Sequence, residues 1–259
     1  MPYTSVAMPN PPLDAARFQP AGDQSLLIYF ADAITPEARD SVLKLLRLLE
    51  SEPISGVRNL HPAYSSLLLT FDPLKLRHAE LQTTLRGYLD RLDRVQLPQP
   101  RIIEIPVCYG GEFGPDLADV ASLHSLTPEQ VIEAHAAATY AVCFLGFVPG
   151  FAYLAGLPDA LATPRLATPR RQVPARSVGI AGRQTGVYPC ATPGGWRLIG
   201  RTPLDMFRAG RPRRVRAVLA ARCEQMSLLA IGDRVHFTPV SRERFAQISR
   251  ERFTDLENA

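Results

Sequence analysis

The sequence predicts an α+β protein with two domains that meet near residue 100. Three observations indicate this fold class. The first hundred residues alternate strand and helix patterns, and residues 97–100 hold two prolines, as expected of a connection. Residues 146–200 then hold nine glycines and seven prolines. That density is incompatible with long helices and is typical of short strands joined by ordered loops.

Residues 23–100 predict a small domain of mixed elements. Apolar periodicity and turn residues define them, and Thr35 and Pro36 supply a helix N-cap and a first helical residue. The expected elements are a strand at 26–30, a helix from 35 to 49, strands at 56–60 and 66–71 and a helix at 81–92. A strand at 103–107 follows the boundary and could pair back into this domain as its last strand. This order of elements predicts a ferredoxin-like domain.

Residues 101–241 predict a β-rich domain. Two short helices come first, at 116–126 and after the capping box of Thr127 and Gln130. The glycine-rich region and a final strand through Val235 and Phe237 then supply a barrel or sandwich. We expect residues 1–22 to be a flexible tail and the charged residues 242–259 to be a helical or frayed one.

The composition is that of a globular protein, with 46% hydrophobic and 21% charged residues among 259. No apolar run reaches the roughly 18 residues of a membrane span, and the N-terminus lacks the pattern of a secretory signal. We therefore expect a cytoplasmic protein without a membrane partner. The scattered histidines and cysteines predict neither a metal site nor disulfides, but four buried thiols: Cys108, Cys143, Cys190 and Cys223.

The charge is unevenly distributed along the chain. Residues 134–223 carry thirteen arginines and only two acids, Asp159 and Asp205, although the whole chain has a net charge of +4. This local surplus predicts an anionic ligand or an acidic partner surface near the region. Nucleic acid is the less favoured partner, because the sequence shows no helix-turn-helix, zinc-finger or RNA-binding signature.

Three motifs carry a resemblance to a known family. The segments FLGFVPGFAYLAGL at 144–157, VPARSVGIAGRQTGVYP at 173–189 and TPGGWRLIGRTPLDMF at 192–207 closely resemble the family of 5-oxoprolinase B subunits. That family includes the kinase A inhibitor and allophanate hydrolase subunit 1 proteins, of the carboxyltransferase subdomain C/D type. The resemblance implies a small α+β domain joined to a cyclophilin-like β-barrel.

The sequence departs from the family pattern at two places. Arg176 stands where the family usually has glycine, and an arginine-rich stretch at 208–222 lengthens the connection to the last strand. If the glycine position requires positive φ, arginine there would be strained, or else the local loop differs from that of the family.

The resemblance also implies a function. The chain would be part of a hydrolase that opens the cyclic amide of 5-oxo-L-proline to L-glutamate with ATP hydrolysis. It would act only with two partners, a larger homologous subunit of the C type and a third protein of the A type. ATP contact rests on the family alone and could be shared with a partner, since the sequence has no G-x-x-x-x-G-K-[ST] loop. The alternatives are a kinase A inhibitor-type regulator that binds a sensor histidine kinase, and a carboxyltransferase or allophanate hydrolase-type subunit.

Side chains that could bind the substrate or ATP cluster in the three motifs. Arginine binds carboxylate and phosphate with paired hydrogen bonds, which makes four arginines candidate anchors, although a solvated basic face or a docking surface explains each of them as well. Three residues of GRQTGVYP could line a substrate groove, or else satisfy nearby backbone. The four arginines are Arg165, Arg170, Arg183 and Arg201, and the three groove residues are Gln184, Thr185 and Tyr188. Trp196 could form a wall against a ring of the ligand, although a role as a core anchor is preferred.

A catalytic residue cannot be assigned from these patterns. His135 is a candidate general base, but a lone helical histidine is more often structural. Glu112 and Asp116 are more typical of a turn and a helix N-terminus than of a site. The aromatic residues Phe144, Phe147, Phe151 and Tyr153 indicate packing, presented by a turn at Pro149 and Gly150.

Overall fold

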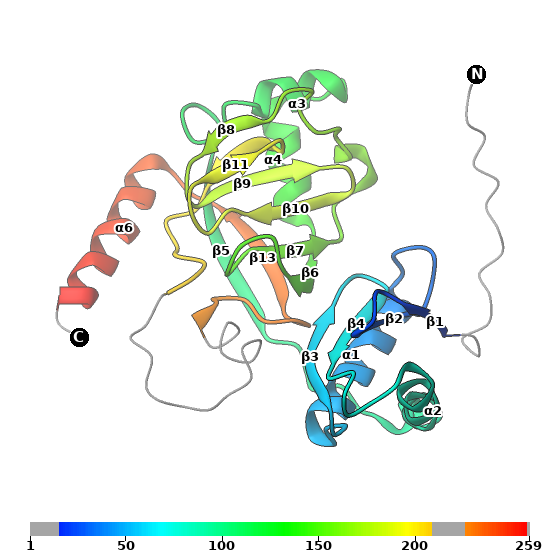
Figure 1. The fold of residues 1–259 in the computed structure, drawn as a ribbon. Helices are drawn as coiled ribbons and strands as arrows, with labels where there is room; N and C mark the ends of the chain where they lie inside the picture. Colours follow the sequence, from blue (N-terminus) through cyan, green and yellow to red (C-terminus); the bar gives the residue numbers. More distant parts are fainter. Residues whose placement is uncertain (1–15, 209–225, 258–259) are drawn as a thin grey trace, which may run out of the picture. The chain divides into compact units, whose positions relative to one another are not determined.

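The computed structural model describes residues 16–208 and 226–257, and the chain divides into two compact units, Met1–Gln99 and Pro100–Ala259 (Figure 1). The elements of the first unit are β1 (Arg17–Pro20), β2 (Ser25–Tyr29), α1 (Pro36–Ser51), β3 (Val57–Pro62), β4 (Ser66–Phe71), α2 (His78–Leu89) and the short 3-10 helix η1 (Leu92–Arg94). The strands form an antiparallel sheet in the order β1-β2-β4-β3.

Sequence signals explain the helices of this unit. Thr35 caps α1, where its Oγ1 accepts a hydrogen bond from the Ala38 backbone at 3.2 Å. The apolar stripe of α1 is buried, and the helix packs against β3 and β4. The buried Leu81 and Leu85 give α2 its inward face.

The complete ferredoxin-like order is not formed. The strands β2, β4 and β3 with α1 follow the split βαβ pattern, but the strand expected after α2 belongs to the second unit, as β5 (Ile102–Tyr109). The edge next to β2 is occupied instead by β1, which lies within the segment predicted as a flexible tail. A hairpin from the N-terminal side therefore completes this sheet, while residues 1–15 lie outside the described part.

The second unit is built around a closed barrel. Its strands run in the order β10-β7-β6-β13-β5-β12-β9, and a two-stranded ribbon of β8 and β11 accompanies them (Figure 1). After β5, the elements are α3 (Leu117–Leu123), α4 (Pro128–Ala137), β6 (Tyr140–Leu145), β7 (Ala152–Ala155), η2 (Asp159–Leu161), β8 (Arg170–Val173), β9 (Ser177–Ala181), β10 (Gln184–Val187), β11 (Thr192–Gly194), β12 (Arg197–Arg201), β13 (Arg234–Pro239) and α6 (Arg242–Glu257).

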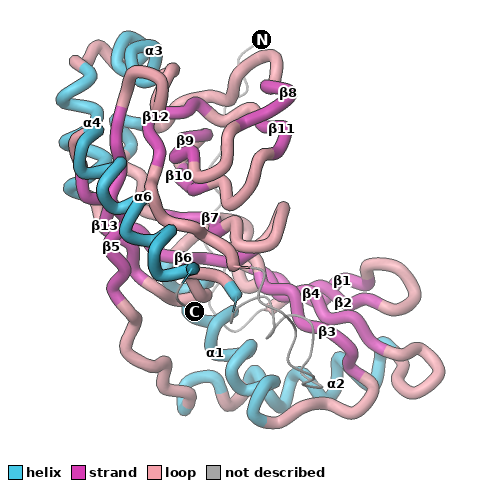
Figure 2. Tube along the Cα trace, turned by 90° about the vertical axis from the view of Figure 1, so that its left-hand side faces the viewer, coloured by secondary structure: helices cyan, strands magenta, loops and turns pink. Residues whose placement is uncertain are grey.

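Two apolar clusters lie on opposite sides of the β9 and β10 strands. The larger one includes Val178, Ile180 and Val187 and extends to α3 and α4, which lie side by side against the barrel (Figure 2). The smaller one is built from Phe151, Val173, Ala181, Tyr188, Trp196 and Leu198. Because side chains alternate across a strand, each strand contributes to both clusters.

Three further expectations can be compared with the structure. Within residues 16–208 and 226–257, no helix has the length and apolar character needed to cross a bilayer. Cys108 and Cys143 are buried as expected, whereas Cys190 is exposed because it follows β10 in a surface turn. Cys223 and most of the arginine-rich stretch at 208–222 lie outside the described residues. Residues 242–257 form the helix α6.

Candidate functional site

Three motif segments converge where β9 begins and β10 ends. The backbone N–H of Arg176 donates to the carbonyl oxygen of Tyr188 at 2.6 Å, and the carbonyl oxygen of Arg176 accepts from Thr202 at 3.0 Å. The loop between β6 and β7 reaches the same region, since a Cβ on Gly150 would lie 2.5 Å from the Cβ of Phe207. The segments 144–157, 173–189 and 192–207 therefore share one edge of the barrel.

Phe147 is exposed at this edge in a strained backbone conformation. Its φ is +67°, a left-handed value that usually costs a non-glycine residue about 1–3 kcal/mol. The residue is 58% exposed, and its ring makes edge-to-face contacts with Phe151 and Tyr188, with centroid distances of 5.5 and 6.5 Å. The sequence had suggested that Phe147 packs inside the protein. Pro149 and Gly150 predict a turn, but they do not predict that the nearby Phe147 has a positive φ and is exposed.

Arg176 is the second strained residue at this edge. Its φ is +69°, a left-handed value, so the condition under which arginine at the usual glycine position would be strained is met. The turn is closed by a backbone hydrogen bond from Ser177 to Pro174 at 3.4 Å, and the Arg176 Nη1 donates to the Pro203 carbonyl oxygen at 3.3 Å. In the described part of the chain, only Ser125 shares the left-handed conformation of Phe147 and Arg176 among non-glycine residues.

Buried aromatic rings support the edge from below. Phe151, Tyr188 and Trp196 are each at most 5% exposed, so Trp196 anchors a cluster and offers little surface to a ligand. The glycines Gly179 and Gly186 face each other across β9 and β10. A Cβ on Gly186 would lie 3.2 Å from both the Phe151 and Trp196 rings, so the missing side chains let these rings lie against the strand backbone.

The loop before β8 and the first residue of β8 place two predicted arginines beside Tyr188. Burial raises the pKa of Tyr188, while a hydrogen bond from the Trp196 backbone and the charges of Arg165 and Arg170 act in the opposite direction. Arg165 is exposed and makes no ion pair with any described residue. Within the described chain it is therefore a free cation next to the aromatic cluster.

Arg170 has a structural role. Its Nη2 donates to Oδ1 of the buried Asp116 at 2.7 Å, and the Oδ2 of Asp116 accepts from the Leu198 backbone, also at 2.7 Å. This ion pair fastens the start of α3 to β12 and to the β8–β11 ribbon. Asp116, predicted as a helix N-terminal residue, is the buried centre of that connection.

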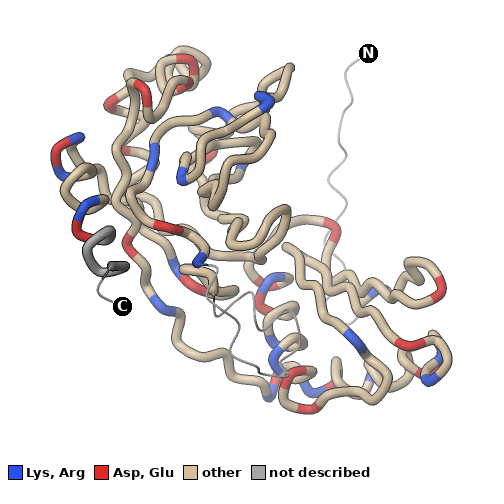
Figure 3. Tube along the Cα trace, turned by 60° about the vertical axis from the view of Figure 1, so that its left-hand side comes forward, with Lys and Arg blue, Asp and Glu red and all other residues tan. Residues whose placement is uncertain are grey.

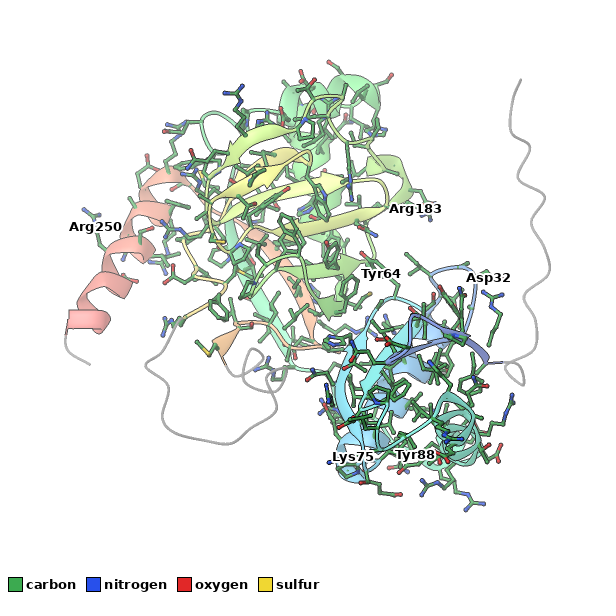
Figure 4. All side chains as sticks on the ribbon, in the orientation of Figure 1. Asp32, Tyr64, Lys75, Tyr88, Arg183 and Arg250 are labelled. Carbon is green, nitrogen blue, oxygen red and sulfur yellow. The ribbon has the colours of Figure 1, made fainter. Side chains whose placement is uncertain are left out.

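The structure separates Arg183 and Gln184 from Tyr188. Both lie at the hairpin end of β9 and β10, which at roughly 3.3 Å per residue is about 13 Å from Tyr188 for Gln184 and about 17 Å for Arg183. Arg183 points outward there and forms an ion pair with Asp159 (Figure 4). Gln184 faces the same side of β10 as Tyr188 but is too distant to share one small ligand with it.

Thr185 and His135 face the barrel interior and are fully buried. The Tyr109 hydroxyl lies 2.8 Å from His135 Nδ1, His135 Nε2 lies 3.0 Å from Thr185 Oγ1, and Thr185 donates to the Gly179 carbonyl oxygen at 3.0 Å. This chain of hydrogen bonds is satisfied when Tyr109 donates to Nδ1 and Nε2–H donates to Thr185. Burial lowers the pKa of His135 to about 3, so the imidazole is neutral. The groove role predicted for Thr185 is thereby corrected, because its hydroxyl is used inside the barrel.

Arg201 ends β12 close to Arg176. Burial lowers the pKa of its guanidinium, the charge of Arg176 lowers it further, and Glu112 acts in the opposite direction. The predicted turn residue Glu112 is exposed and forms an ion pair with Arg242 at 2.9 Å. Arg201 is therefore the second predicted anchor at the converging edge.

The basic surplus of the sequence is partly neutralised in the fold. Acids outside the arginine-rich region pair with it, since Asp116 and Asp119 bind Arg170 and Arg197. Figure 3 shows acidic and basic positions interspersed along the described part of this unit. Among the described residues, no group of three or more His, Cys, Asp or Glu side chains is arranged to hold a metal ion.

Known structures share the fold. The crystal structure of TTHA0988 matches 84% of this chain with 35% identity and a TM-score of 0.70, and the matched part is 40% of that protein. The Kluyveromyces lactis urea carboxylase matches 94% of this chain with 18% identity and a TM-score of 0.72, and the matched part is 24% of that enzyme. The second likeness concerns the fold alone.

Sequence comparison identifies the family. The carboxyltransferase domain, subdomain C and D, matches residues 16–216. The 5-oxoprolinase B subunit of Bacillus subtilis is 38% identical over 232 residues, which are 86% of this chain and 92% of that protein. The chain therefore belongs to the family of 5-oxoprolinase B subunits.

Proposed function

We propose that this chain is the B-type component of an ATP-dependent 5-oxoprolinase, a hydrolase complex that converts 5-oxo-L-proline to L-glutamate. Relatives from three bacteria are named as B subunits of 5-oxoprolinase, and the Bacillus subtilis protein is matched over nearly its whole length. In this proposal the chain works with two partners, a larger homologous subunit of the C type and a third protein of the A type.

The exposed Phe147 beside Tyr188 is the observation that carries the site. A rigid aromatic face held in a strained conformation suits the apolar ring carbons of a lactam, and strain of this kind is retained where the surroundings impose it. The free guanidinium of Arg165 lies on the same cluster and could bind the substrate carboxylate through two hydrogen bonds. Trp196 and Phe151 support this surface without facing the ligand.

The chain's own residues fit only part of the chemistry. When bound, ATP would supply the phosphoryl group that activates the lactam carbonyl towards water. Guanidinium donors for phosphate are present at the converging edge, but the nucleotide site would be completed by a partner protein, since no phosphate-binding G-x-x-x-x-G-K-[ST] loop occurs. His135 does not suit the role of the base, because it is fully buried, both ring nitrogens are already paired, and its burial-lowered pKa makes it a weak base.

Reconstitution tests the proposal. The chain is co-expressed with its candidate partners, and ATP-dependent glutamate release from 5-oxoproline is measured with and without it. We expect activity only when the chain is present. Full turnover in its absence would refute the proposed role.

Variants of Phe147 test the site separately. Phe147→Gly removes the ring and suits the left-handed backbone, so the protein should fold while kcat/KM for 5-oxoproline falls at least about tenfold. Phe147→Tyr keeps the aromatic face and should retain most activity. Leu123→Ala, at a 52% exposed apolar residue of α3, is the matched surface control. Equal activity of Phe147→Gly and the control would remove Phe147 from the site.

A further inference from the structure

Arg201 is partly buried, and its guanidinium has neither a hydrogen-bond nor an ion-pair partner among the described residues. Its Nε is buried and has no hydrogen-bond partner among the described residues, and none of their carboxylates forms an ion pair with it. The side chain is held over the ring of Phe113, with the guanidinium carbon 5.7 Å from the ring centroid. A buried guanidinium nitrogen that makes no hydrogen bond costs free energy, while the Nη1 and Nη2 atoms of Arg201, which are not among the buried unpaired atoms, remain accessible to an anion.

The acids near Arg201 are used by other cations. Glu112 binds Arg242 at 2.9 Å, and Arg242 also lies over the Phe113 ring, 5.5 Å from its centroid. Asp205 lies 4.0 Å from Arg176, at the limit of an ion pair. The local carboxylates are thus committed, and the charge of Arg201 is not balanced by a direct contact with a described residue.

A second guanidinium lies next to Arg201. Arg201 pairs with Ser177 across β12 and β9, which places it beside Arg176 in the neighbouring turn. Arg176 keeps a left-handed backbone at φ +69°, and its Nη1 is fixed to the Pro203 carbonyl oxygen. Two guanidinium groups held close together repel each other, and the contact of Arg176 with Asp205 at 4.0 Å offsets this repulsion only in part, so an anion bound between them would be stabilising.

We infer that Arg176 and Arg201 together form a binding site for a dianionic oxyanion of the phosphate class, at the edge where β12 and β9 meet. A tetrahedral dianion can neutralise both guanidinium groups and accept hydrogen bonds from each fork. A carboxylate carries one negative charge and, because Asp205 lies only at the distance limit of an ion pair with Arg176, would balance the two guanidinium groups less fully than a dianion. The pair therefore favours phosphate over carboxylate, and this inference stands whether or not the proposed function is correct.

Binding of inorganic phosphate to the isolated full-length chain tests the inference. Titration calorimetry at constant ionic strength, with phosphorus NMR line broadening as a second readout, should show one site per chain. Arg176→Gly removes one guanidinium and suits the backbone of the turn, so this variant should fold and should weaken phosphate binding at least about tenfold. Arg201→Gln should weaken it similarly, and Arg201→Lys should restore it only in part because lysine lacks the fork.

A matched control separates a built site from general charge attraction. Arg183→Gln removes one positive charge at the far end of β9 and β10 and should leave phosphate binding unchanged. Acetate and glutamate should bind more weakly than phosphate. The inference is overturned if Arg176→Gly binds phosphate as the natural chain does, if Arg183→Gln weakens it equally, or if carboxylates bind as tightly. Since no turnover is measured, phosphate binding by a chain that fails in reconstitution would overturn only the proposed function.

Discussion

Replacing His135 by glutamine should alter how the stability of the second unit depends on pH. In the folded chain, burial lowers the pKa of His135 to about 3, against an ordinary value of 6.5. Between these values the unfolded chain binds a proton that the folded chain does not. This histidine therefore lowers stability as the pH falls from about 6.5 to about 3, and it has no such effect above pH 6.5.

The size of the effect follows from the two pKa values. Each pH unit in that window changes the free energy of unfolding by at most about 1.4 kcal/mol, and the change between pH 7 and pH 5 should be about 2 kcal/mol. Glutamine cannot titrate and can only partly replace the hydrogen bonds to Tyr109 and Thr185. We expect His135→Gln to be less stable at pH 7 and the difference from the natural chain to shrink by about 2 kcal/mol at pH 5.

Urea unfolding followed by the fluorescence of Trp196, the only tryptophan, measures this difference at each pH. NMR of the histidine rings in the natural chain gives an independent measurement, because the His135 signals should not titrate between pH 7.5 and 4.5. A stability difference that stays constant from pH 7 to pH 5, or a His135 ring that titrates near pH 6, would refute the buried neutral imidazole. The second result would also restore His135 as a candidate general base.

Two further predictions concern packing and charge beside the aromatic cluster. Gly194→Ala should destabilise the protein by about 1–3 kcal/mol in urea unfolding, because the added Cβ would lie 2.5 Å from the Tyr188 hydroxyl oxygen. Gly195→Ala is the control and should be tolerated, because the atoms nearest to its Cβ belong to Pro169, at 3.6 Å. Equal effects of the two changes would contradict this. Asp116→Asn should lower the free energy of unfolding by about 2 kcal/mol, because Arg170 loses its charged partner. Adding Arg170→Gln to this variant should recover part of the lost stability. If the effects of the two substitutions simply add, the pair is not coupled.

Local signals were sufficient to predict most elements of the fold. The cap at Thr35 and the capping box at Thr127 mark the starts of α1 and α4, and the β-type run at 177–181 is β9. The fourth strand of the first sheet was assigned wrongly for a physical reason. The alternating pattern of β5 suits any half-buried strand, and nothing in it distinguishes pairing with β2 from pairing with β13.

The site was harder to predict than the fold, because its contacts join distant segments. Arg170 looked like an anion anchor until the fold brought Asp116, 54 residues away, to its guanidinium. Thr185 and Tyr188 looked like neighbours in one groove, yet residues three apart on a strand face opposite sides, and Thr185 met His135 inside the barrel. Arg176 was the exception, since a glycine position in the family pattern already carries information about φ.

The two strained residues, Phe147 and Arg176, indicate that this edge is shaped for binding at the expense of stability. Both keep left-handed backbones at a cost of about 1–3 kcal/mol each, and both lie next to Tyr188. If these residues served packing alone, glycine at either position would remove the strain and lose few stabilising contacts. Phe147 is mostly exposed, and the Arg176 guanidinium makes only one long hydrogen bond and one ion pair at the distance limit. Glycine at each position should therefore raise stability and weaken ligand binding together. A variant that gained stability and kept both phosphate binding and turnover would show that the strain has no function.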